Sequence, residues 1–145
     1  MTNEVTRLVA AGTAPANPIN YTVTDTPNIE KGTIMRFSGS YIVAASSLAG
    51  QTFAGFANTE KVSGDGSTTI GVDTCGIFDC YVSCACSGSL AVGQTVSISG
   101  ANILVPTSAL ALSGQAYQLG IVVGRALEPL TTGSADTIAV AVGVY

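Results

Sequence analysis

The chain has 145 residues, of which 47% are hydrophobic and only 10% charged, with a net charge of −4 and no histidine. That length fits one domain or two very small ones, and no apolar stretch approaches the roughly 20 residues of a spanning helix, so we expect no membrane partner. The basic residues are spread along the chain instead of clustered, which argues against a nucleic-acid partner: Arg7, Lys31, Arg36, Lys61 and Arg125.

The first 27 residues differ from the rest of the chain. They lack the basic and apolar regions of a secretory signal, so we expect no export by that route. Prolines at positions 15, 18 and 27 oppose both regular helix and an uninterrupted sheet ladder. We therefore predict an extended N-terminal arm over residues 1–27, with a possible short strand at 19–23. Two readings of this arm stay open, a frayed terminus and a segment that orders on binding a partner.

Residues 28–145 predict a β domain. Short β-branched and aromatic segments alternate there with turn residues, as in a compact β-barrel or β-sandwich. The only candidate helical turn, at 109–111, is weak. The candidate strands are Thr33–Ser38, Tyr41–Ala44, Thr52–Ala57, Thr68–Val72, Gly76–Ser83, Thr95–Ser99, Asn102–Pro106, Gln118–Ala126 and Thr137–Val144.

The β domain contains one pattern twice. Residues 93–108 repeat residues 32–47 at an offset of 93 − 32 = 61, and most other positions in the window exchange like for like. The sequence therefore predicts two tandem β repeats, with halves at about 28–88 and 89–145, closed as one barrel or packed as two small ones. The identical pairs are Gly32 and Gly93, Ser38 and Ser99, Gly39 and Gly100, Ile42 and Ile103, and Ser47 and Ser108.

The alignment of the repeats resumes further on at a slightly larger offset. There Gly55 meets Gly120, and residues 69–72 meet residues 137–140. What repeats is a β pattern with turn glycines, and no chemically reactive residue repeats with it.

Two kinds of turn recur in this domain. Ser38-Gly39-Ser40 and Ser99-Gly100-Ala101 lie between paired strands and predict tight hairpins in which glycine supplies a positive φ. A second turn, made of an apolar residue, polar or small residues and a glycine, precedes alternating strands and starts at Ile29, Leu90 and Leu130.

Little in the chain suggests catalysis, and we expect no enzyme and no catalytic residues. Without histidine the common nucleophile and base pairs are missing. A serine and lysine pair would need Lys31 or Lys61, but both follow a glutamate beside a turn, which favours solvated ion pairs. Asp73 and Asp79 share a strand face only if the strand extends to Asp73, so they make a poor acid and nucleophile pair.

The cysteines are the one concentrated reactive group. Their C-x4-C-x3-C-x-C spacing matches no usual zinc ribbon. On a strand through residues 76–83, Phe78, Cys80 and Val82 share one face and Cys84 continues it, so cysteine would serve as a small buried hydrophobe. A disulfide and a metal stay open as alternatives. The four cysteines are Cys75, Cys80, Cys84 and Cys86.

The glycine-rich loop over residues 63–67 raises the question of a bound phosphate or cation. It lacks the Lys-Ser/Thr of a P-loop, and it has too few oxygen ligands for a calcium loop. We expect no cofactor-binding and no metal-binding residues in the chain.

Several segments together resemble the head decoration, or capsid cement, proteins of tailed bacteriophages. The resemblance covers about residues 28–145 and depends on the order and density of small, turn-forming and apolar residues. The clustered cysteines and the small-residue stretch 44–50 depart from the family pattern. The matching segments are Phe53-Ala54-Gly55-Phe56-Ala57-Asn58-Thr59-Glu60-Lys61, Gly64-Asp65-Gly66-Ser67-Thr68-Thr69-Ile70, Gly76-Ile77-Phe78-Asp79, Leu90-Ala91-Val92-Gly93-Gln94-Thr95-Val96, Leu119–Glu128 and Gly133–Val142.

The resemblance implies a structural virion protein on the outer surface of a head shell, made in the host cytoplasm. Its partners would be the major capsid protein, whose subunits it bridges, and further copies of itself in a homotrimer. The N-terminal arm would meet the shell. The alternative is a β-sandwich adhesion or glycan-binding module of a virion fibre, although the chain has no tryptophan and only five tyrosines for an aromatic platform.

Overall fold

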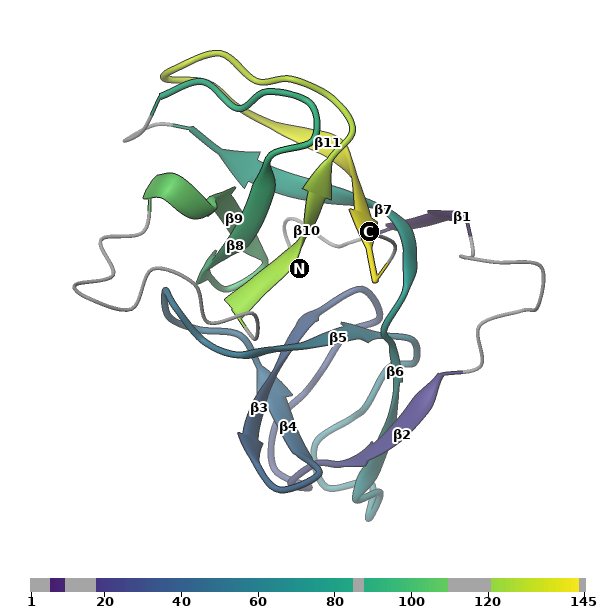
Figure 1. Ribbon diagram of the computed structural model, residues 1–145. Coiled ribbons are helices and arrows are strands. Elements are labelled where there is room, and N and C mark those ends of the chain that lie inside the picture. The colour runs from purple at the N-terminus through teal and green to yellow at the C-terminus, as the bar shows by residue number, and fades with distance from the viewer. Residues whose placement is uncertain (1–5, 10–17, 85–87, 110–120, 144–145) are drawn as a thin grey trace.

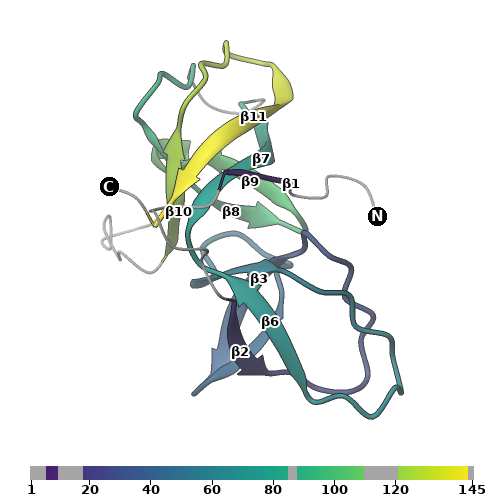
Figure 2. The same ribbon diagram turned by 90° about the vertical axis from the view of Figure 1, so that its right-hand side faces the viewer.

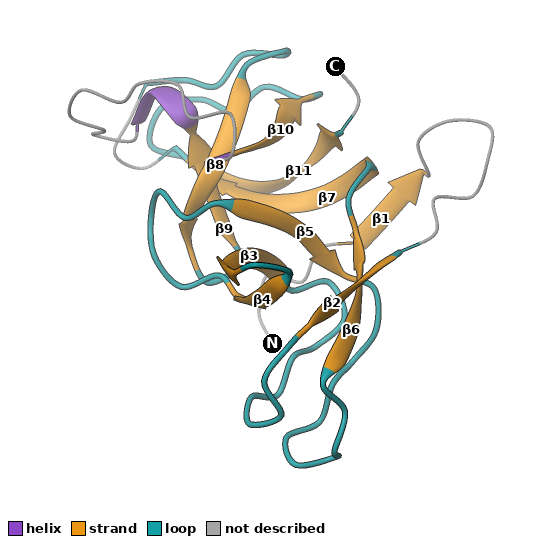
Figure 3. Ribbon diagram, turned by 60° about the horizontal axis from the view of Figure 1, so that its bottom comes forward, coloured by secondary structure: helices purple, strands orange, loops and turns teal. Residues whose placement is uncertain are grey.

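The computed structural model describes residues 6–9, 18–84, 88–109 and 121–143. This part of the chain is almost entirely strand and turn (Figure 3), which confirms the predicted all-β class, and it contains no helix able to span a membrane. The strands are β1 (Thr6–Val9), β2 (Ile19–Thr22), β3 (Ile34–Gly39), β4 (Ile42–Ala45), β5 (Phe53–Ala57), β6 (Thr69–Asp73), β7 (Gly76–Ser83), β8 (Thr95–Gly100), β9 (Ile103–Pro106), β10 (Val122–Ala126) and β11 (Ala135–Val142), with a 3-10 helix η1 (Thr107–Ala109) after β9.

Five strands close the first barrel in the order β2-β4-β3-β5-β6. Its neighbours are antiparallel except for β2 and β4, which run parallel where Thr22 lies opposite Ile42. Alternation of apolar and small residues places one face of each strand inside the barrel. The buried side chains of this core are Val23, Ile29, Met35, Val43, Ala54, Ala57, Ile70 and Val72.

The second barrel joins β7, β11, β10, β8 and β9, and the parallel pairing of β7 with β9 closes it. Along β7, buried and half-buried residues alternate, so Phe78, Cys80 and Val82 point inward as predicted. Strand β1 adds to β7 outside this ring, with Thr6 opposite Asp79. Figures 1 and 2 show this barrel above the first one.

The two barrels are copies of one topology, which confirms the predicted tandem repeat in the form of two small packed barrels. Strands β2 to β6 pair with one another as β7 to β11 do, including the single parallel pair. Turn glycines repeat as well, since φ is 85° at Gly32, 87° at Gly93 and 81° at Gly133.

One part of the sequence alignment needs correction. Opposite residues on β3 and β5 are Ile34 and Phe56, and their counterparts on β8 and β10 are Thr95 and Arg125. The offset on β10 is therefore 125 − 56 = 69, which aligns Gly55 with Gly124 and not with Gly120. The reason is a longer connection between β9 and β10 than between β4 and β5.

The predicted boundaries also shift. Strand β2 is part of the first barrel, and Val23 is only 2% exposed in its core, so the arm does not extend to residue 27. The first barrel ends with β6 at Asp73 and the second begins with β7 at Gly76, so the halves divide near residue 75 and not near 88. Prolines flanking a four-residue strand concealed its role in the sequence, because such a strand gains its stability from tertiary pairing.

Candidate functional site

A contact between the barrels involves the β8–β9 hairpin of the second barrel. Asn102, at the turn of this hairpin, is only 2% exposed, and its side-chain Oδ1 accepts a hydrogen bond of 2.8 Å from the backbone N–H of Ile34 on β3. The hydroxyl of Ser46 donates to the carbonyl of Gly100 at 2.9 Å and accepts from the N–H of Asn102 at 3.4 Å. Every group named here is satisfied across the contact, so the hairpin fixes the second barrel on the first.

Apolar side chains extend this contact. Ile34 and Phe56 lie on the outer face of the first barrel, and both belong to the hydrophobic core of the second. The ring of Phe56 lies 4.4 Å from that of Phe78, measured between centroids. The barrels therefore share buried apolar surface, which holds them as one body.

The equivalent hairpin of the first barrel, β3–β4, is exposed and lies away from the second barrel (Figure 1). Tyr41 is 77% exposed, Ile42 38% and Phe37 36%. The ring of Phe37 packs edge-on against that of Tyr21, with centroids 5.4 Å apart. We call Tyr21, Phe37, Tyr41 and Ile42 the open tip. Phe37, Tyr41 and Ile42 are exposed apolar side chains on one hairpin, and the half-buried Tyr21 packs beside Phe37. Exposed apolar side chains gathered in this way mark contact surfaces, so the open tip is the candidate functional site.

The hairpin turns differ from the prediction in one respect. The positive φ belongs to Tyr41 and Asn102, both at 56°, and not to Gly39 or Gly100. The two glycines lie instead at register shifts where the strands bulge. The repeat thus places a left-handed residue at the same turn position in each barrel, buried in one and exposed in the other.

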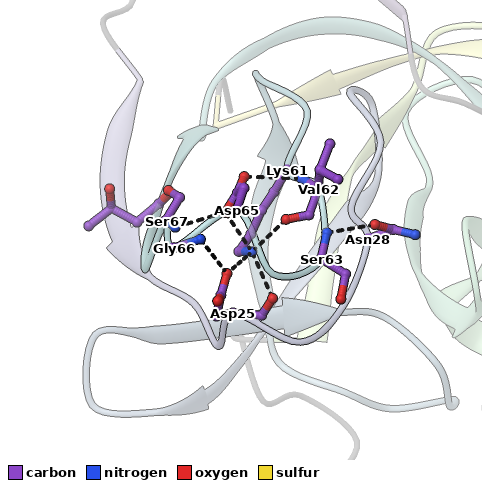
Figure 4. Close-up of polar contacts among 9 residues, drawn as sticks. Asp25, Asn28, Lys61, Val62, Ser63, Asp65, Gly66 and Ser67 are labelled. Atoms are coloured by element: carbon purple, nitrogen blue, oxygen red, sulfur yellow. Dashed lines mark hydrogen bonds and ion pairs between the residues drawn. The ribbon is translucent and has the colours of Figure 1, made fainter.

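Figure 4 shows a second polar cluster, around Lys61. The Lys61 ammonium is buried and donates to the carboxylate of Asp25 at 3.0 Å and to that of Asp65 at 3.3 Å. It also donates to the backbone carbonyls of Asp25 and Val62, at 3.1 and 3.2 Å. Asp65 in turn accepts from the N–H of Ser67 at 2.7 Å. The ammonium therefore ties two loops together.

These contacts shift two pKa values in directions that favour the charged forms. Burial alone lowers the pKa of Lys61, but the hydrogen bonds and charges of Asp25 and Asp65 outweigh it and raise the pKa above its usual 10.5. The hydrogen bond from the N–H of Ser67, helped by Lys61, lowers the pKa of Asp65 below 3.8. Burial acts in the opposite direction but is outweighed. Both groups are charged at neutral pH.

The predicted solvated pair of Lys61 with Glu60 is wrong. Lys61 and Ile29 form an isolated bridge that matches the bridge between Leu90 and Leu130, so Lys61 occupies the apolar position of the recurrent turn. Its aliphatic stem is buried where the second barrel has Leu130. The sequence did not indicate this copy of the turn, because a lysine stands at its apolar position, although Gly64, with φ of 75°, follows three residues later as in the other copies.

We predict that Lys61→Met lowers the urea midpoint of unfolding, because it leaves the carbonyls and carboxylates around it without their donor. The raised pKa of Lys61 stabilises the fold fully below pH 10.5, and this contribution is lost as the pH rises through the folded value. The lowered pKa of Asp65 stabilises above pH 3.8, and this contribution is lost as the pH falls through the folded value.

The measurement is the urea midpoint of wild type and variant from pH 3 to 11, with Lys31→Met as control because Lys31 is exposed. The wild type should lose stability at both ends of this range, and Lys61→Met should lose less there. Equal midpoints for wild type and Lys61→Met at pH 7 would refute a stabilising role for the cluster.

The described cysteines carry free thiols, as the sequence favoured. Cys80 and Cys84 are buried and Cys75 is half-buried, while Cys86 lies outside the described residues. Burial, with a smaller effect of the nearby Asp79 charge, raises the pKa of Cys80, so its thiol stays protonated. Among the described residues no group of three potential ligands could hold a metal ion.

The two aspartates considered as a catalytic pair lie on different barrels. Asp73 ends β6, is 5% exposed and accepts a hydrogen bond of 2.9 Å from the side-chain amide of Asn58. Asp79 lies half-buried on β7. No single strand contains both Asp73 and Asp79, because β6 ends at Asp73 and β7 begins at Gly76, so the two aspartates do not share a strand face.

The fold that these observations define is a tandem pair of five-stranded barrels joined by one buried hairpin. No protein-family model and no curated protein sequence matches the chain.

Proposed function

We propose that this chain is a structural virion protein that decorates and stabilises the outer surface of a tailed-phage head shell by bridging major capsid protein subunits. The observation that carries the proposal is the buried contact between the barrels. A subunit that bridges neighbours must hold its contact surfaces at a fixed separation, and the Asn102 hydrogen bonds and the Phe56–Phe78 contact would do so.

Two further features support this function. The sequence resembles head decoration proteins over about residues 28–145, and the open tip supplies exposed apolar side chains for a protein contact. Many weak contacts repeated over a shell add through multivalency, so no single contact needs high affinity. On this proposal the protein is not an enzyme, and it acts on the virion surface as a homotrimer.

The proposal predicts saturable binding to expanded heads that lack the protein. Purified chain is mixed with such heads, the heads are sedimented, and the bound copies per head are counted. A plateau that matches the number of local symmetry sites supports a decoration protein. A folded protein that stays in the supernatant at all concentrations would contradict it. Disrupted heads of the same capsid protein serve as the control for non-specific adsorption.

The exposed rings of the open tip favour one second candidate, the adhesion or glycan-binding module. Tyr41 is exposed at the turn of the hairpin whose strand β3 carries Phe37, and Phe37 packs on Tyr21; aromatic faces of this kind can stack on sugars. Binding to immobilised glycans that Tyr41→Ala abolishes, without binding to heads, would favour this candidate.

A further inference from the structure

The contact between the two barrels is heterologous. The hairpin of the second barrel meets a different surface on the first, made by Ile34, Ser46 and Phe56. Because the barrels are repeats, each surface has a counterpart that this contact leaves unused. The hairpin that this contact leaves unused is the open tip. The surface that corresponds to Ile34, Ser46 and Phe56, and that could receive a hairpin, lies on the second barrel.

The residues of this second-barrel surface follow from the alignment of the strands. Thr95 corresponds to Ile34, Thr107 to Ser46 and Arg125 to Phe56, since Thr95 and Arg125 face each other as Ile34 and Phe56 do. We call Thr95, Thr107 and Arg125 the open base. Thr95 and Thr107 are half-buried and Arg125 is exposed, whereas Ile34 is 0% and Ser46 4% exposed under the docked hairpin.

We propose that the open tip of one copy of this chain binds the open base of a second copy, repeating between chains the contact that joins the barrels within one. The partner is a second copy because its open base is built on the same strand positions as the surface that already receives a hairpin. Heterologous contacts of this type generate a ring, or an open chain if the rotation does not close.

The chemistry of the two surfaces fits this contact. The Thr107 hydroxyl lies 2.8 Å from the hydroxyl of Ser97 and can accept a hydrogen bond from it. It can then donate to the carbonyl of Gly39 in the second copy, as Ser46 donates to the carbonyl of Gly100 within one chain. Arg125 replaces Phe56 and would lie against the rings of the open tip, where a guanidinium is attracted to aromatic faces. Tyrosine and arginine are both enriched at the cores of interfaces.

The differences between the two contacts suit their roles. Ile34 and Phe56 are permanently buried, so they can be apolar, whereas the open base must be soluble before association and is polar. Interfaces that form between free subunits are generally more polar than obligate ones. The inference concerns how copies of the chain associate, which is one part of the proposed function, and its test does not depend on a shell.

The test is sedimentation velocity of the purified full chain, whose monomer mass is 14.5 kDa. The wild type should show concentration-dependent masses above the monomer. Tyr41→Gly removes the ring and suits the left-handed turn, and Arg125→Ala removes the guanidinium. Each should weaken association at least about tenfold, because central tyrosine and arginine side chains are enriched among the residues whose truncation costs an interface most. Tyr41→Phe, which keeps the ring, should associate as the wild type does.

Mixing the two weakened variants tests the heterologous geometry. Tyr41→Gly keeps its open base and Arg125→Ala keeps its open tip, so an equimolar mixture retains one intact contact and should form dimers that stop there. A monomeric wild type, association unchanged in both variants, or a mixture that stays monomeric would each overturn the proposal. Unchanged thermal unfolding of each variant confirms that its fold is intact.

Discussion

Gly124→Ala is expected to destabilise the second barrel severely. A Cβ at this position would overlap the backbone carbonyl oxygen of Ala141 on β11 and lie 3.0 Å from Cγ1 of Val140. A backbone carbonyl cannot rotate away as a side chain can, so β10 and β11 must separate locally. We expect a loss of roughly 3 kcal/mol, at the upper end for added volume in a packed site. Domains are stable by only about 5–15 kcal/mol, so this loss is large.

Urea unfolding of Gly124→Ala measures this effect, and Gly88→Ala is the matched control. Gly88 is exposed, and no heavy atom lies within 4 Å of the position of its Cβ. The control should stay within about 0.5 kcal/mol of the wild type. The same argument applies to Gly55, where a Cβ would meet the carbonyl oxygen of Asp73 at 2.5 Å. If Gly124→Ala unfolded with the midpoint of Gly88→Ala, the close approach of β10 and β11 would be disproved.

The sequence was sufficient to predict most strands from β3 onward and the repeat, because both leave local patterns, but it did not indicate β1 at Thr6–Val9. Alternating residues and turn glycines are visible without tertiary context, and β7 begins and ends where its pattern predicts, at Gly76 and Ser83. The burial of Cys80 and Cys84 could be predicted from the same alternation of side chains. Two copies of one pattern also implied two copies of one topology, which the pairing of strands confirms.

Tertiary context decided what the sequence could not. Nothing local marks β2 as a barrel strand, since its pairing partners lie about 20 and 50 residues away. Lys61 is buried because its turn bridges to Ile29 and contacts the loop of Asp25, whereas a charged residue in a turn otherwise suggests exposure. The repeat did contain one usable signal for the inter-barrel contact. Asn102 stands where the first repeat has Tyr41, a polar and an aromatic residue at one turn position.

Asn102→Ala is the second change with a large expected effect. It removes the acceptor for the N–H of Ile34, which is then buried without a partner, at a cost of about 1–3 kcal/mol. Alanine also lacks asparagine's tolerance for φ of 56°, which adds about 1 kcal/mol. We expect the variant to unfold at lower urea and the Ile34 amide to exchange its hydrogen faster, because the contact between the barrels loosens.

Two further variants separate these contributions. Asn102→Gly removes the amide but suits the turn, so it should lose only the hydrogen-bond part. Tyr41→Ala provides the matched control, because Tyr41 has the same φ of 56° and no buried role for its side chain, so its stability should change by no more than about 0.5 kcal/mol. An Asn102→Ala variant no less stable than Tyr41→Ala would mean that the buried hairpin does not fix the barrels. The bridging function requires barrels held rigidly by this hairpin, and the proposed contact between copies repeats the same hairpin contact. Such a result would therefore weaken both proposals.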